Sequence, residues 1–200
     1  MAKLILVLAN PGTGKSSSLR NLKAEEVTVV SVTGKELPFK TDIKSITPKN
    51  SAEVVKIVND SKKPIVVIDD ANYLLSFEEM ARANEVGYTK FTQMAQGFFN
   101  IIKAIIDKDS DQVFYIMAHS EQEEDGQLRL KTTGKMLSEK IVIEGLTNVV
   151  LNAIVDEDGE FVFKVKTDGM GVKSPIGMFD TPTTPNDLKE VSKKVKEFYK

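Results

Sequence analysis

The sequence predicts an α/β fold in which a mainly parallel sheet is flanked by helices. Four short apolar or β-branched runs have the composition of strands buried on both faces: residues 4–9, 27–32, 65–68 and 113–118. Between them, residues 52–58 and 89–108 carry apolar side chains at steps of three and four, which is typical of amphipathic helices. Strands that alternate with helices of this length favour parallel pairing through right-handed crossovers.

The pattern changes in the last quarter of the chain. Residues 149–155 and 161–166 flank an Asp-Glu-Asp-Gly turn, so we expect a hairpin that adds antiparallel strands to the sheet. Residues 187–199 form a predicted amphipathic helix with a lysine-rich outer face. We therefore predict one domain over residues 1–200, with its core at about 1–155 and the hairpin and C-terminal helix at about 149–200.

Composition excludes several kinds of site. The 200-residue chain is 41% hydrophobic and 28% charged, as expected for a globular protein, and its net charge of −2 argues against a uniformly basic nucleic-acid-binding surface. It has no cysteine and one histidine, His119, which rules out disulfides, thiolate zinc sites and multi-histidine metal sites. The first apolar run is too short to span a membrane. We expect a cytoplasmic protein, of a bacterium or a phage-infected cell, with no membrane partner.

A glycine-rich segment follows the first predicted strand. Residues 9–16, Ala-Asn-Pro-Gly-Thr-Gly-Lys-Ser, nearly match the phosphate-binding pattern G-x-x-x-x-G-K-[ST]. Glycines at 12 and 14 let successive backbone N–H groups converge on an anion, and a helix predicted at residues 15–22 would direct its N-terminus at the phosphates. Ala9 replaces the first glycine of the pattern, but it ends the strand, where negative φ is tolerated.

This loop predicts a site for a nucleoside triphosphate, ATP with Mg²⁺. Lys15 is expected to reach the β- and γ-phosphates, and the Ser16 hydroxyl to ligate Mg²⁺. Asp69, at the end of the apolar run at 65–68, is the predicted second Mg²⁺ ligand, because ligands of open α/β sheets bind at the carboxyl ends of the strands. The residues predicted to bind the nucleotide are Asn10, Pro11, Gly12, Thr13, Gly14, Lys15, Ser16 and Ser17.

Three further residues are candidates for catalysis beside Lys15. Asp70 follows Asp69, and Glu36 follows the second predicted strand, so either carboxylate is a candidate to orient the attacking water. His119 follows the strand predicted at 113–118, where a polar side chain would sense the γ-phosphate; the plainer interpretation is a structural histidine. The sequence leaves these alternatives open.

The order of the parts resembles a compact RecA-like ATPase. More narrowly, the chain is similar to small phage nucleotide-binding proteins of the single-strand annealing and recombination type. The resemblance implies a P-loop NTPase fold and ATP hydrolysis in DNA recombination or replication. It also implies single-stranded DNA at the polar loop 121–135, where Arg129, Lys131 and Lys135 follow an acidic half, or at the loop 76–88. A homo-oligomer is implied as well, in which a lysine acts on the neighbouring nucleotide; the candidates are Lys164, Lys166 and Lys173.

Three other functions compete with this interpretation. An AAA-type loader or remodelling protein usually has a helical lid with an arginine, whereas this chain predicts a hairpin and one helix after the core. A small-molecule kinase usually has an arginine-rich lid, and this chain has only Arg20, Arg82 and Arg129. The third alternative is a nucleotide-gated binding module with little hydrolysis, which the unsettled choice of catalytic carboxylate leaves open.

Overall fold

The computed structural model describes residues 1–134 and 136–200, and for Ser138 and Glu139 it describes the backbone alone. Lys135, one of the residues predicted to attract DNA phosphates, lies outside the described residues. All other predicted site residues are described.

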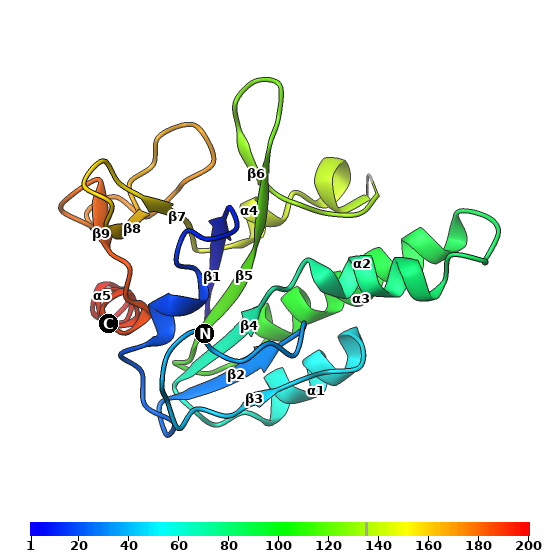
Figure 1. Cartoon of the computed structure of the whole chain (residues 1–200), viewed down its shortest axis with the longest axis horizontal. Coiled ribbons are helices and arrows are strands. Elements are labelled where there is room, and N and C mark those ends of the chain that lie inside the picture. The colour runs from blue at the N-terminus through cyan, green and yellow to red at the C-terminus, as the bar shows by residue number, and fades with distance from the viewer. Residues whose placement is uncertain (135) are drawn as a thin grey trace.

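One mixed sheet organises the described part of the chain (Figure 1). Its strands are β1 (Lys3–Ala9), β2 (Val27–Ser31), β3 (Ser45–Ile46), β4 (Ile65–Asp69), β5 (Val113–Gln122), β6 (Leu128–Leu130), β7 (Val149–Val155), β8 (Phe161–Lys164) and β9 (Thr183–Pro185). They lie in the order β3-β2-β4-β5-β1-β7-β8-β9, with β6 paired to β5. The pairs from β3 to β7 are parallel and the β7–β8 and β8–β9 pairs are antiparallel, which confirms the predicted α/β fold with a late hairpin.

Helices cover both faces of this sheet. They are η1 (Ser16–Leu19), α1 (Ser51–Asp60), α2 (Tyr73–Ala81), α3 (Thr89–Ile106), the π-helix η2 (Met136–Ile141), α4 (Ile143–Leu146) and α5 (Leu188–Phe198). Alternation along β1 divides the core: Leu4, Leu6 and Leu8 pack with residues of α1 and α3, while Ile5 and Val7 pack with residues of η1 and α5. β8 and β9 continue the same sheet as β1–β7. The predicted division of the single domain into a core and a C-terminal segment therefore stays a prediction.

Two helical predictions need correction. The helix predicted at 15–22 is only the four-residue 3₁₀ turn η1. Three successive serines are poor helix formers, and the Ser18 hydroxyl donates to the Lys15 carbonyl at 2.5 Å instead. The helix predicted at 52–58 begins one residue earlier, at Ser51, because the side chain of Asn50 caps it by accepting from the backbone N–H of Glu53.

The two predicted loops are also more ordered than expected. Half of the loop predicted at 76–88 is the end of α2, which projects with α3 beyond the sheet (Figure 1). In the loop predicted at 121–135, β5 runs on to Gln122 and pairs with β6 as an antiparallel hairpin that stands off the sheet (Figure 1). The hairpin therefore continues directly from the strand that carries His119.

Candidate nucleotide-binding site

The carboxyl ends of β1, β2, β4 and β5 share one edge of the sheet because these strands are parallel neighbours. A cleft of about 310 Å³ opens there. Its walls come from the glycine-rich loop, the segment after β2, the ends of β4 and β5, and the start of β8; they are Asn10, Pro11, Gly12, Gly14, Lys15, Ser16, Ser17, Lys35, Pro38, Asp70, His119 and Phe161. The topology thus brings most of the predicted nucleotide-binding residues to one place.

The loop itself has the backbone that a phosphate cradle needs. Gly12 and Gly14 have φ angles of 82° and 85°, in the left-handed region that favours glycine. Thr13 does not line the cleft; its hydroxyl donates to the Asn10 carbonyl at 2.9 Å, which fixes the turn. The Ser120 hydroxyl donates to the Asn10 side chain at 3.3 Å and ties the loop to β5.

Lys15 lies at the centre of a buried charge cluster. Its Nζ is 2.8 Å from Asp69 Oδ1 and also donates to Asp70 Oδ1. Lys15 and Asp69 are 7% exposed and Asp70 is 8% exposed, so both ion pairs are shielded from water. The hydroxyl of Ser16 donates to Asp69 Oδ2 at 2.6 Å. The residues predicted to bind phosphate and metal are therefore in direct contact.

The cluster keeps Lys15 and Asp70 charged. Burial lowers the pKa of Lys15, but the charges and hydrogen bonds of Asp69 and Asp70 outweigh it and raise that pKa above its usual value. Burial raises the pKa of Asp70, but Lys15, with His119 and Lys35, outweighs it and holds that pKa below its usual value. An ammonium and a carboxylate are therefore available here at neutral pH.

Asp70 is held from several sides. Its φ of 58° is in the left-handed region, which is uncommon for a residue other than glycine. Oδ2 accepts from the Thr33 hydroxyl at 3.2 Å, and Oδ1 lies 3.8 Å from His119 Nε2. The backbone N–H of His119 donates to Asn72 Oδ1 at 3.1 Å, so the segment after β4 also fixes β5 at His119.

A family model describes this part of the chain. The model for the ATPase family associated with various cellular activities (AAA) matches residues 5–139, which include the loop, Asp69, Asp70 and His119. The chain belongs to the AAA family. A search of curated proteins gave no match. In the described residues, no helix of this AAA protein is both long and apolar enough to cross a membrane.

The donor set of the AAA site suits magnesium. Mg²⁺ prefers oxygen ligands and is usually held by one or two carboxylates together with substrate phosphates and water. Ser16 Oγ and Asp69 Oδ2 supply two adjacent oxygens beside the loop. No group of three or more acidic or histidine side chains that would hold a metal by itself occurs among the described residues. The residues therefore fit a metal that arrives with a nucleotide.

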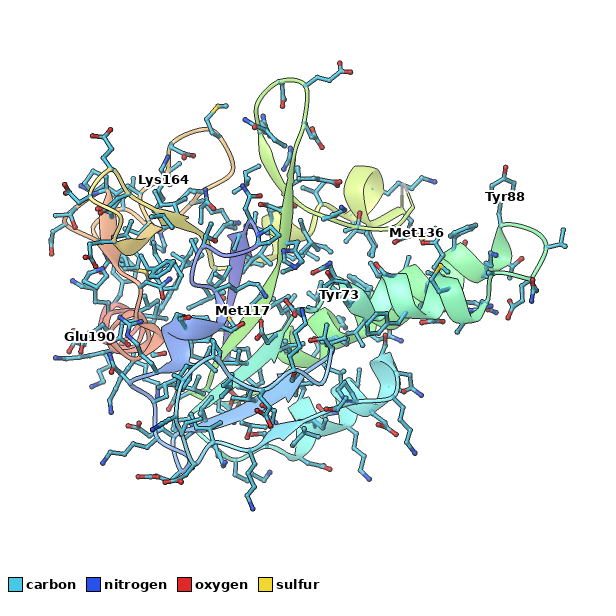
Figure 2. The ribbon with its side chains drawn as sticks, viewed as in Figure 1. Tyr73, Tyr88, Met117, Met136, Lys164 and Glu190 are labelled. Carbon is cyan, nitrogen blue, oxygen red and sulfur yellow. The ribbon has the colours of Figure 1, made fainter. Side chains whose placement is uncertain are left out.

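Other predicted residues of this AAA protein lie outside the cleft. Glu36 is exposed and lines a separate cavity beside residues 34–47, because the chain turns at Gly34, whose φ is 69°. Lys164 lies exposed on the outer hairpin (Figure 2), and Lys166 donates to the Asp180 carbonyl at 2.7 Å. Lys173 is half-buried and pairs with Val150 through its backbone, and burial lowers its pKa despite Glu144.

Sequence reasoning missed four residues of the site. Thr33 and Lys35 follow β2, and the Lys35 Nζ lies 4.0 Å from Asp70 Oδ2. A polar residue after a parallel strand is the signal that identified Asp69, and it applies to Thr33 as well. Pro38 and Phe161 reach the cleft from a loop and from the late hairpin. No local pattern marks either residue as part of a nucleotide site.

Proposed function

We propose that this AAA protein binds ATP with Mg²⁺ in the cleft and hydrolyses it. One observation carries the proposal: Lys15 and Ser16 of the glycine-rich loop both contact Asp69 at the end of β4, inside a buried cluster. A structural ion pair would need Lys15 and one carboxylate, but not a hydroxyl, a second carboxylate and an open cleft. Phosphoryl transfer uses all of these groups.

Each residue has a role that follows from its charge and position. Lys15 neutralises the β- and γ-phosphates, for which it exchanges its contact with Asp70. Ser16 and Asp69 hold the metal, and Mg²⁺, when bound, neutralises charge on the transferred phosphoryl group. Asp70, released from Lys15 and still held by Thr33, orients and deprotonates the attacking water. His119, within 3.8 Å of Asp70, is placed to sense the γ-phosphate.

The test is phosphate release and nucleotide binding by the wild type and two lysine variants. We expect Lys15→Ala to reduce turnover by about 10²-fold or more, because a positive group at the transferred phosphate is lost. Lys56→Ala, which removes an exposed lysine of α1, is the matched control and should retain full activity. Unchanged turnover in Lys15→Ala would refute the proposal. Binding of MgATP without turnover in the wild type would favour the nucleotide-gated module.

We further propose the finer role that the sequence suggests, action on single-stranded DNA in recombination or replication of a phage. The β5–β6 hairpin supports this role, because it continues from the strand that bears His119. A partner bound at the hairpin would thus be linked to the nucleotide site through β5. Arg129 and Lys131 lie on its returning side, near the sheet, and are the groups that would meet phosphates. The acidic run at 121–125, which spans the end of β5 and the following turn, and the family membership support the alternative, an AAA-type loader or remodelling protein that acts on another protein.

One comparison separates these two roles. If the hairpin binds DNA, single-stranded DNA should stimulate ATP turnover, and Arg129→Ala should abolish the stimulation while the basal rate stays the same. Absence of stimulation at low salt would favour the AAA-type alternative.

Light scattering with and without MgATP tests the proposed homo-oligomer, in which Lys164, Lys166 or Lys173 would act in trans. Their positions outside the cleft of their own chain are compatible with that role.

A further inference from the structure

An aromatic side chain lies in a cleft otherwise suited to phosphate. Phe161 begins β8, and its side chain lines the same cleft as the glycine-rich loop. A Cβ atom added to Gly14 would lie 2.7 Å from Phe161 Cδ1, so the edge of the ring occupies the space that a side chain at position 14 would need. Glycine at position 14 is thus required both by its φ and by this close approach.

The backbone of Phe161 is fixed while its ring stays accessible. Phe161 pairs with Val155 of β7, and its carbonyl accepts from the Asn186 N–H at 3.2 Å. Two residues further along the same face of β8, Phe163 is completely buried in the core beside α5. Phe161 lies two residues before Phe163, outside that core, and remains 44% exposed. Its free ring surface therefore faces the cleft and not the core.

A chain of phosphate groups would make no favourable contact with this apolar ring. Phosphates are bound by N–H donors and cations, whereas the planar, apolar part of a nucleotide is its base. We propose that Phe161 is the base-binding residue of the site, and that the base of the bound nucleotide packs on its ring. This inference rests on the proposed nucleotide-binding function and adds the residue that distinguishes a nucleotide from bare triphosphate.

The identity of the residue also determines selectivity. A phenyl ring has no donor or acceptor to read the edge of a base, and every base has a π-face that stacks. The contact therefore does not select one base by hydrogen bonding, and the substrate class is nucleoside triphosphates, with ATP and GTP bound alike.

The experiment compares ligands with and without a base. Titration calorimetry measures the Kd of MgATP, MgGTP and magnesium tripolyphosphate for the wild type, Phe161→Ala, Phe161→Leu and Phe161→Tyr. We expect Phe161→Ala to weaken ATP and GTP by about tenfold, as for loss of one stacked base, with tripolyphosphate unchanged. Phe161→Leu keeps an apolar contact with Gly14 and should lose most of this affinity, whereas Phe161→Tyr should keep it. Phe198→Ala removes a similarly exposed phenylalanine of α5 and should change none of the three.

Each other outcome overturns the proposal in a recognisable way. If Phe161→Ala weakens ATP and tripolyphosphate by the same factor, the ring only supports the loop. If the wild type binds tripolyphosphate as tightly as ATP, no base contact exists, although the phosphate site stands. If the wild type binds neither ligand, the proposed nucleotide-binding function fails together with the inference.

Discussion

At the scale of the residue, Asp70 is the side chain whose environment is most unusual. Its left-handed backbone turns the carboxylate back into the cleft, where it meets Lys15, Thr33 and His119. Glu36, the competing carboxylate, is exposed beside another cavity. A group that activates water needs to lie within hydrogen-bond reach of it, directly or through one further water, and a position in the cleft favours Asp70.

Asp70→Asn is therefore expected to lower kcat by about 10²-fold or more while the Kd of MgATP changes little, because the variant lacks the base but keeps Ser16 and Asp69. Asparagine tolerates the left-handed backbone, so the fold should be retained. Steady-state phosphate release and equilibrium binding measure the two quantities. Glu36→Gln is the matched control and should stay within about threefold of the wild type. Loss of activity in Glu36→Gln alone would reverse the assignment.

At the scale of the element, the loop and the C-terminal helix are joined. The Asn21 side chain, just after η1, donates to Asp187 Oδ2 at 2.6 Å, and Arg20 donates to the Asn186 carbonyl at 2.5 Å. Asp187 Oδ1 also caps α5 by accepting from the Lys189 N–H at 2.8 Å. With only four residues, η1 makes few hydrogen bonds of its own, so these contacts hold the end of the phosphate loop in place.

We predict that Asp187→Ala lowers the free energy of unfolding by about 1–2 kcal/mol, because it removes the cap of α5 and leaves Asn21 without its acceptor. Urea denaturation at constant m-value measures the change. Asp180→Ala is the control: that side chain is 91% exposed and lies 3.8 Å from Lys194, so its loss should cost less than about 0.5 kcal/mol. Equal losses in the two variants would show that the cap contributes nothing specific.

The sequence predicted those elements whose signals are local. Buried apolar runs identified β1, β4 and β5, and the glycine-rich motif identified Lys15 and Ser16, because each signal lies within a few residues. The β5–β6 hairpin was not predicted: Leu128-Arg129-Leu130 of β6 alternates, but three residues are too few to identify a strand, and the end of β5 that pairs with them is polar. Sheet order brings Thr33 to Asp70 and Phe161 to the cleft, and pairing between distant strands is not encoded in any short segment.

At the scale of the whole molecule, the cleft depends on most of the sheet. Its walls come from the ends of β1, β4 and β5, from the segment after β2 and from β8 at the far side of β7. The unfolded chain has no such cleft, because these segments are far apart in sequence. A ligand that contacts all of them therefore binds the folded state alone and must stabilise it by mass action.

The size of this stabilisation follows from the affinity. At a concentration of MgATP one hundred times Kd, linkage gives about 2.7 kcal/mol. For a chain of this length that corresponds to a rise in Tm of roughly 5–10 °C, which a thermal melt measures without any turnover. Lys15→Ala would lose the proposed phosphate contact and should show no rise at the same concentration. The Tm of Asp70→Asn should rise like that of the wild type, because the role proposed for Asp70 is to act on water and not on the bound nucleotide. An equal rise in Lys15→Ala would place the nucleotide outside this cleft; no rise in Asp70→Asn would make Asp70 a binding residue and not a catalytic one.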